Sequence, residues 1–185
     1  MNKYLKHFAI VINLENPILA EVENSWHVLQ EFGMQFISSR SKMPHIALVS
    51  SHIDDAQLLS KKMVDIVNVI NCFDIKSNGL GVFVRKTPVI YLRWYLNQEL
   101  YNLYNKMAQL LKNQGDMLTD STQADQWLPK TTLAFHDTNY NKLELILKKL
   151  NRFNYEQTMS VKSLSLLELT TERESELEKY NLSRF

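Results

Sequence analysis

Cysteine, proline and glycine are scarce in this 185-residue chain, which has one cysteine and four each of proline and glycine. The single cysteine, Cys72, excludes an internal disulfide and any cysteine-based zinc site. The chain also lacks an excess of charge of either sign, because 21 lysines and arginines balance 20 acidic residues and leave a formal net charge of +1. Without a basic block or tail, we expect no binding to long duplex nucleic acid. A compact anionic ligand stays open, since a few placed cations can hold it.

Long apolar runs are also missing. No stretch of the sequence reaches the roughly 20 residues that a membrane-spanning helix needs, so we expect no membrane partner. The apolar run at residues 8–12 is shorter than the core of a signal peptide, and Glu15 follows it without a small-residue cleavage site. We therefore expect a cytoplasmic protein, and we expect it to be a monomer.

Two seven-residue segments of the chain align without a gap. Residues 43–49 and residues 128–134 each begin with an apolar residue and a proline, followed by a large nitrogen-bearing side chain and an alternating strand. Alternation places His45 with Ala47 on one face of the first strand, and Lys130 with Thr132 on one face of the second. If both strands face a common cleft, His45, Lys130 and Thr132 point at one ligand.

The order of elements around these segments also occurs twice. Apolar and alternating patterns predict strands at 8–12, 45–50, 73–76 and 82–84, and again at 89–92, 130–135, 153–155, 161–169 and 180–185. Any α+β chain shows some such repetition, but the matching spacings favour an internal duplication. We expect an α+β fold with two pseudo-symmetric lobes, a duplicated βαβαββ unit whose antiparallel sheets line a central cleft. One bilobal domain would cover residues 1–185, with lobes at about 1–86 and 87–185 and final strands that could cross between them.

Capping and turn residues mark the ends of the predicted helices. Asn16 offers an N-cap with Pro17 at the first helical position, and Gly33 fits the position after the helix. Asn97 is the N-cap of a second helix, closed by Gly115. Further helices are predicted from about Asp54 and Tyr140, a turn at Asn78–Gly79, and polar loops at 34–42 and 116–126.

This layout resembles the 2H phosphoesterase superfamily, which includes bacterial 2′–5′ RNA ligase-like proteins and cyclic phosphodiesterases. The resemblance covers nearly the whole chain, including residues 79–83, 88–92 and 127–129. That family carries two His-x-Thr/Ser-x motifs, one on each lobe. The resemblance implies that two histidines act as general base and general acid on a phosphodiester, that the hydroxyls hold phosphate oxygens, and that neither a metal nor another cofactor is needed.

Each motif of this chain departs from the family pattern at one position. The first keeps His45 but has Ala47 in place of the hydroxyl, and the second keeps Thr132 but has Lys130 in place of the histidine. A positioned acid or base contributes roughly 10²–10⁴ in rate, and a lost hydrogen bond to a charged group costs about 1.5–3 kcal/mol. Catalysis therefore suffers more than binding, because an ammonium group still faces the ligand.

Other residues are candidates for ligand contacts. Arg85 and Arg93 could hold phosphate oxygens, and the aromatic side chains of Phe83, Tyr91 and Trp127 could stack on a base. For each of these residues, packing in the core or on the surface is the alternative interpretation. A further histidine, His136, lies on the face of Lys130 but roughly 20 Å along the strand, which is too far for a direct substitute.

Three functions remain open from the sequence. The first is a divergent 2H-like protein that binds a cyclic nucleotide or a short RNA-type phosphodiester with weak or absent hydrolysis, as a nucleotide sensor or sponge. The second is an active, metal-independent phosphodiesterase that cleaves 2′,3′-cyclic, 2′–5′ or cyclic-oligonucleotide linkages with His45 and Lys130. The third is a non-catalytic protein-interaction module.

Overall fold

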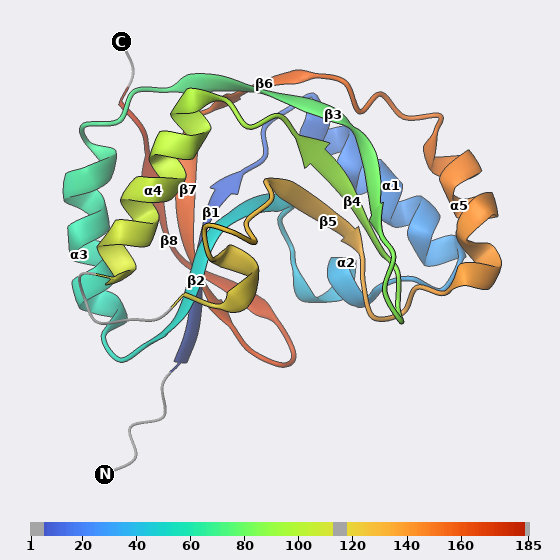
Figure 1. Cartoon of the computed structure of the whole chain (residues 1–185), viewed down its shortest axis with the longest axis horizontal. Coiled ribbons are helices and arrows are strands. Elements are labelled where there is room, and N and C mark those ends of the chain that lie inside the picture. Colours follow the sequence, from blue (N-terminus) through green and yellow to red (C-terminus); the bar gives the residue numbers. More distant parts are fainter. Residues whose placement is uncertain (1–5, 113–117, 184–185) are drawn as a thin grey trace.

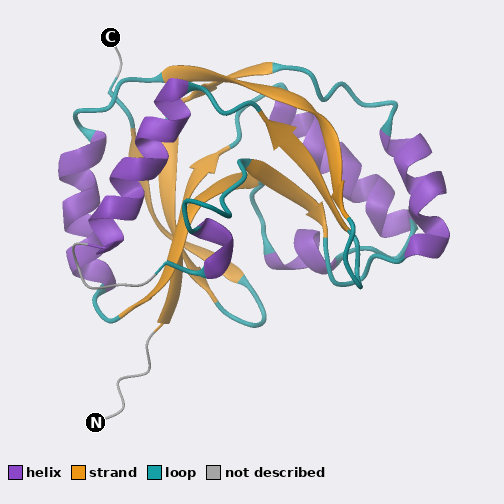
Figure 2. Cartoon of the chain, in the orientation of Figure 1, coloured by secondary structure: helices purple, strands orange, loops and turns teal. Residues whose placement is uncertain are grey.

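Two curved antiparallel sheets stand side by side in this protein, with helices on their outer faces (Figure 1). A computed structural model describes residues 6–112 and 118–183. Figure 2 shows the strands gathered in the middle of the molecule and the longer helices at its two flanks. The predicted α+β fold with two lobes is therefore confirmed.

The first sheet has the strand order β2-β1-β7-β8, and each neighbouring pair is antiparallel. The apolar run of the N-terminal segment forms its central strand β1, which is buried from Phe8 onward. The last two strands of the chain complete the sheet. Its strands are β1 (Lys6–Asn13), β2 (His45–Ile53), β7 (Ser163–Leu169) and β8 (Glu174–Asn181).

The second sheet has the order β5-β4-β3-β6, again with antiparallel pairs throughout. Its strands are β3 (Phe73–Phe83), β4 (Val89–Trp94), β5 (Lys130–Ala134) and β6 (Thr158–Val161). Strand β3, from the first half of the sequence, joins this sheet, whereas β7 and β8, from the second half, join the first sheet.

Helices α1 and α4 also pack against strands that come from the other half of the sequence. Helix α1 follows β1 in the chain but packs against β5 of the second sheet, whereas α4 follows β4 but packs against β2 of the first sheet. Figure 1 shows α3 and α4 on one flank and α1 and α5 on the other. The helices are α1 (Ile18–Glu31), α2 (Phe36–Arg40), α3 (Ala56–Val67), α4 (Gln98–Lys112) and α5 (Leu143–Leu150), with 3-10 turns η1 (Asp120–Thr122) and η2 (Tyr140–Lys142).

Two of the predicted helix ends are confirmed by their hydrogen bonds. Gly33 follows α1 with a φ of +80°, and the next amide, that of Met34, donates to the carbonyl of Leu29 at 3.0 Å. The side chain of Asn97 accepts from the amide of Leu100 at 2.9 Å, as an N-cap of α4 does. Both ends are determined by local chemistry.

The predicted turn at Asn78–Gly79 is wrong, because β3 runs through it as one long strand. The first part of β3 pairs with β6 and its last part with β4, with a register shift between Ser77 and Leu80. Gly79 has a φ of +67°, a left-handed conformation that favours glycine. Gly79 therefore lies at the irregular point where β3 changes partner, because the segments on either side of it pair with different strands.

Several other boundaries also differ from the prediction. Helix α1 begins after Pro17 without a side-chain cap from Asn16, and the expected loop at 34–42 contains α2. Residues 153–155 form no strand, since the segment that pairs with the start of β3 is β6. The last strand ends at Asn181, earlier than expected, whereas Gly115 and residues 184–185 lie outside the described residues.

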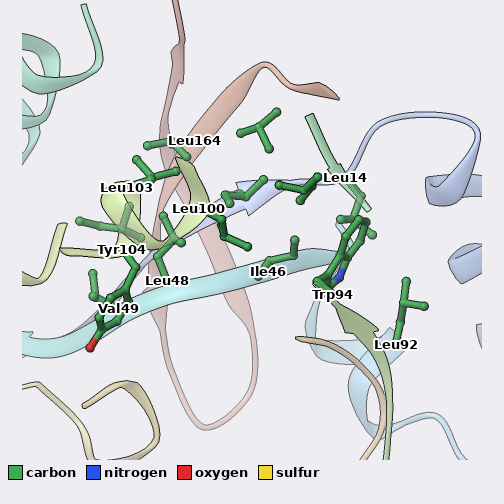
Figure 3. Close-up of a cluster of buried hydrophobic side chains, with 14 of the residues drawn as sticks. Leu14, Ile46, Leu48, Val49, Leu92, Trp94, Leu100, Leu103, Tyr104 and Leu164 are labelled. Carbon is green, nitrogen blue, oxygen red and sulfur yellow. The ribbon is translucent and has the colours of Figure 1, made fainter. Parts of the chain in front are cut away.

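The two lobes share one core rather than two. Leu100, Leu103 and Tyr104 of α4 pack over β2, and the same cluster continues through Ile46 to Trp94 of the second sheet (Figure 3). Such continuity fixes the two sheets relative to each other. In the part of the chain that the structure covers, no helix has the length and apolar character to cross a membrane.

Candidate functional site

One cavity between the two sheets brings the paired motifs together. It is lined by His45 and Ala47 of β2 and by Lys130 and Thr132 of β5, and it measures about 460 Å³ with its open mouth included. Strands β2 and β5 contact each other directly, and the first residue of each, His45 and Lys130, lines the cavity. The structure therefore gathers all four motif residues around one space.

The prolines of the two motifs have equivalent positions. The carbonyl of Pro44 accepts from the amide of Leu14 at 3.3 Å, and the carbonyl of Pro129 accepts from the amide of Trp94 at 3.2 Å. In each case the proline lies one residue before its strand, where its missing N–H costs no ladder bond. This shared geometry starts both strands at the mouth of the cavity.

The imidazole of His45 is held in one orientation. Its Nδ1 lies 3.0 Å from the carbonyl oxygen of Met43, and because a carbonyl only accepts, Nδ1 carries the hydrogen. The neutral ring then has its lone pair on Nε2, as a general base requires. The carboxylate of Glu174, the first residue of β8, lies 4.0 Å from the same Nδ1. Protonation of the ring would create an ion pair there.

Lys130 occupies a less polar environment than a surface lysine. Burial lowers the pKa of its ammonium group below the usual 10.5, and the nearby positive charge of Arg85 lowers it further. Its Nζ lies 5.9 Å from the ring centre of Phe83, while the Arg85 guanidinium carbon lies 5.3 Å from that ring. Lys130 is therefore a cation that releases a proton more readily than an exposed lysine does.

Another donor in this cavity was missed by sequence reasoning. Trp26 of α1 lines the cavity, and its Nε1 is buried without a hydrogen-bond partner among the described residues. The sequence shows Trp26 only as one member of a helical apolar stripe, which is typical of the core. Its position at the cavity depends on the packing of α1 against β5, which local patterns do not reveal.

Of the predicted stacking residues, Tyr91 and Phe83 share a sheet face with Lys130, and neither lines this cavity. Tyr91 pairs with Thr132 and Arg93 with Lys130, so all four side chains project from the same face of the second sheet. Phe83 stacks on Tyr91, with ring centres 4.3 Å apart. Tyr91, Arg93 and Phe83 therefore lie on the face that carries Lys130 and Thr132, outside the cavity lining.

The ring of Tyr91 lies across the backbone of Gly81. A Cβ at that position would come within 2.4 Å of the ring, so a side chain there would displace Tyr91. Glycine at 81 thus sets the orientation of the aromatic pair beside the motif face.

Trp127 contacts both strand β2 and helix α4. Its Nε1 donates to the carbonyl of Ala47 at 2.9 Å, and its ring stacks on Tyr104 at 4.2 Å between centres. One face and the polar edge of the indole are therefore occupied by the protein. Its predicted stacking on a base stays a prediction.

The other histidines lie away from the motifs. His136 is exposed, has a φ of +70° and contacts Phe36, and His7 stacks on His52 at 4.6 Å. Burial lowers the pKa of His7, and the neighbouring His52 lowers it further. Within residues 6–112 and 118–183 no three histidine, cysteine or acidic side chains gather as metal ligands.

Comparisons with known proteins agree with this arrangement at the level of the fold. No family model matches the chain, and no curated protein matches it by sequence. Among solved structures, LigT of E. coli complexed with 3′-AMP is similar with a TM-score of 0.64 at 13% identity, covering 97% of this chain and 99% of that one. TT0787 of Thermus thermophilus gives 0.66 at 14% identity over 95% and 97% of the two chains.

The MHV ns2 PDE domain is a third similar structure. It has a TM-score of 0.52 at 15% identity, covering 89% of this chain and 99% of that one. LigT has also been crystallised in complexes with NADP+ and with ATP. The chain therefore has the fold of these structures, and the fold implied by the 2H resemblance is confirmed.

Proposed function

We propose that this protein binds a cyclic nucleotide or a short RNA-type phosphodiester in the cavity between its sheets, with weak or absent hydrolysis. The observation that carries the proposal is one cavity lined by His45, Lys130 and Thr132 together. An ammonium group, a hydroxyl and the free N–H of Trp26 are three donors that suit the oxygens of one phosphate. The nucleotide complexes of LigT, which has the same fold, support this ligand class.

Weak turnover follows from what the motifs lack. Ala47 offers no hydroxyl to the phosphate, and Lys130 replaces an imidazole that would titrate near neutral pH. Together these changes lower the rate by about 10³–10⁶ if nothing replaces the lost groups. A protein of this kind acts as a sensor or a sponge, because the nucleotide stays bound when its hydrolysis is slow.

An active phosphodiesterase is the second candidate, and the state of Lys130 favours it. Nε2 of His45 would take the proton from the attacking hydroxyl or water as the new P–O bond forms. The Lys130 ammonium would give its proton to the leaving oxygen as the old P–O bond breaks, and its lowered pKa makes that transfer easier. The proton that His45 gains returns to solvent, and Lys130 regains one.

The test is incubation with 2′,3′-cyclic nucleotides, 2′–5′ dinucleotides and cyclic oligonucleotides, followed by chromatography and by calorimetry of binding. We expect binding that Lys130→Met weakens at least tenfold, with little product. His136→Ala is the matched control, because this histidine is exposed and lies outside the cavity. Product formation that His45→Ala abolishes would establish the enzyme instead. Absence of binding to every phosphate ligand would leave the interaction module.

A further inference from the structure

A second cavity adjoins the one that holds the motif residues. It measures about 1060 Å³ with its open mouth included, and it shares Ser41, His45 and Glu174 with the first cavity. A ligand held at His45 can therefore extend from one cavity into the other. Where the first cavity presents an ammonium, a hydroxyl and an indole N–H, the second has a different chemistry.

The floor of the second cavity is apolar. Val11 of β1 and Leu167 of β7 belong to both the cavity lining and a small apolar cluster on the inner face of the first sheet. Ala9 lies in the same cluster beside Ala47. Short side chains along a sheet make a broad apolar surface, which suits the face of a planar ring better than a charged group.

Asn13, the last residue of β1, presents a hydrogen-bond acceptor at this floor, and a chain of hydrogen bonds determines its orientation. Ser165 Oγ donates its hydrogen to the Glu176 carboxylate at 2.6 Å. Ser165 can then only accept from Asn13, so the nitrogen of the amide faces it at 2.8 Å, and its other hydrogen goes to Ser163 at 3.1 Å. The amide oxygen of Asn13, Oδ1, is therefore on the other side of the side-chain amide.

That amide oxygen has no partner among the described residues. Asn13 is only 5% exposed, and its Oδ1 is buried without a hydrogen bond. Oε2 of Glu174 is also buried without a hydrogen bond, although His45 Nδ1 lies 4.0 Å from it, and both residues line the second cavity. Two buried acceptors without a donor are costly, at about 1–3 kcal/mol each, unless a ligand supplies the missing hydrogens.

The cations of this cavity lie at its mouth and not at its floor. Lys42 and Arg173 are exposed, and the Arg40 guanidinium donates to the carbonyl of Thr170 and lies over the ring of Phe36. The buried groups therefore accept hydrogen bonds, whereas Lys42 and Arg173 are exposed and the Arg40 guanidinium is occupied by other protein groups. Such a cavity selects against an anion at its floor and in favour of a planar group that carries N–H donors.

We propose that the second cavity binds the nucleobase of the ligand and selects bases with an exocyclic amino group. This inference rests on the proposed function, because it places the phosphodiester beside His45. The amino group of adenine, cytosine or guanine donates two hydrogens, one for Asn13 Oδ1 and one for Glu174 Oε2. An oxo group at the same position, as in hypoxanthine or uracil, sets a third acceptor against these two.

The alternative is that Asn13 only supports His45. The two residues are direct cross-strand partners in the β1–β2 ladder, so their side chains are neighbours on one face. A support role would affect every ligand that reaches His45 equally. Base selection would affect only the difference between an amino base and its oxo analogue, which gives the two roles separate readouts.

The test compares 3′-AMP with 3′-IMP, which differ by an amino and an oxo group, and uses inorganic phosphate as a third probe in calorimetry. We expect 3′-AMP to bind at least tenfold more tightly than 3′-IMP. Asn13→Leu should reduce that ratio towards one while phosphate affinity stays the same, and Asn13→Asp should keep an acceptor and most of the ratio. Glu174→Gln supplies a donor for the oxo group and should also lower the ratio.

Each remaining outcome decides against one of the two ideas. Equal affinities for 3′-AMP and 3′-IMP, with phosphate binding intact, overturn base selection and leave the proposed function standing. An unchanged ratio in both Asn13→Leu and Glu174→Gln, with circular dichroism showing folded variants, does the same. If the wild-type protein binds none of the three probes, both proposals fail together.

Discussion

The indole Nε1 of Trp127 donates a hydrogen bond to the carbonyl oxygen of Ala47 at 2.9 Å. This bond joins the segment before β5 to the middle of the motif strand β2, so it links the two sheets at the cavity. Residues on both sides of it, His45 and Lys130, line that cavity. The bond therefore bears on the distance between the two functional strands.

Replacing Trp127 with phenylalanine should loosen this link. Phenylalanine keeps an aromatic ring against Tyr104 but loses the N–H, and we expect a stability loss of about 1 kcal/mol in urea unfolding. Ligand affinity should fall several-fold in addition. Trp94→Phe is the matched control, because its indole bonds to Thr131 within the second sheet at 3.1 Å. Equal affinity losses in the two variants would contradict a role in linking the sheets.

Restoring the missing hydroxyl of the first motif should strengthen phosphate binding. Ala47 lines the cavity, and a threonine there adds a donor that reaches a phosphate oxygen. We expect Ala47→Thr to raise the affinity for a nucleotide roughly tenfold, from a hydrogen bond to a charged group. Ala47→Val has the same shape without the hydroxyl and should give no gain. Calorimetry that finds Thr and Val equivalent would show that Ala47 does not face the phosphate.

Ligand binding should cause proton uptake at alkaline pH. Burial and Arg85 lower the pKa of Lys130 below 10.5, so part of the lysine loses its proton before other lysines do. A phosphate beside it favours the charged form and raises that pKa again. We expect calorimetry in buffers of different ionisation enthalpy to show proton uptake that grows as pH rises towards the lowered pKa. Lys130→Met should abolish it, and uptake that persists in this variant would assign it to another group.

Two buried tyrosines should make the protein sensitive to high pH. Burial raises the pKa of Tyr155 and of Tyr180 to about 12, from 10.0. Above pH 10 the unfolded chain loses these protons before the folded one does, so the free energy of unfolding falls between about pH 10 and 12. The fall is at most about 1.4 kcal/mol per pH unit for each tyrosine, and less where solvent screens the phenolate. Tyr155→Phe should reduce this slope in urea titrations at several pH values, whereas Tyr140→Phe, at an exposed position, should leave it unchanged.

Local chemistry made much of the site predictable from the sequence. The alternation in the two motif strands placed His45 and Ala47 on one face and Lys130 and Thr132 on another, and the cavity contains all four. The position of Gly33 and the cap from Asn97 likewise depend on neighbouring residues alone. Features that depend on a few consecutive residues are the ones that sequence patterns report.

Features that depend on strand partners were not predictable. Asn78 and Gly79 have the sequence of a tight turn, but the segments on either side pair with different strands, so the chain passes through them as one strand. Glu174 approaches His45 only because β8 joins the first sheet through β7, far along the chain. A single sequence carries no direct record of such pairings, because they are decided by the packing of the whole core.

The exchange of strands and helices between the halves has a consequence for dissecting the molecule. A fragment that ends near residue 86 contains β1, β2 and β3 but lacks the β7 and β4 strands that flank them. A fragment with the remainder lacks the centre of the first sheet. Neither piece can bury its own apolar faces, yet each supplies what the other needs. The protein is therefore suited to fragment complementation, in which two separately made pieces regain structure and ligand binding only on association.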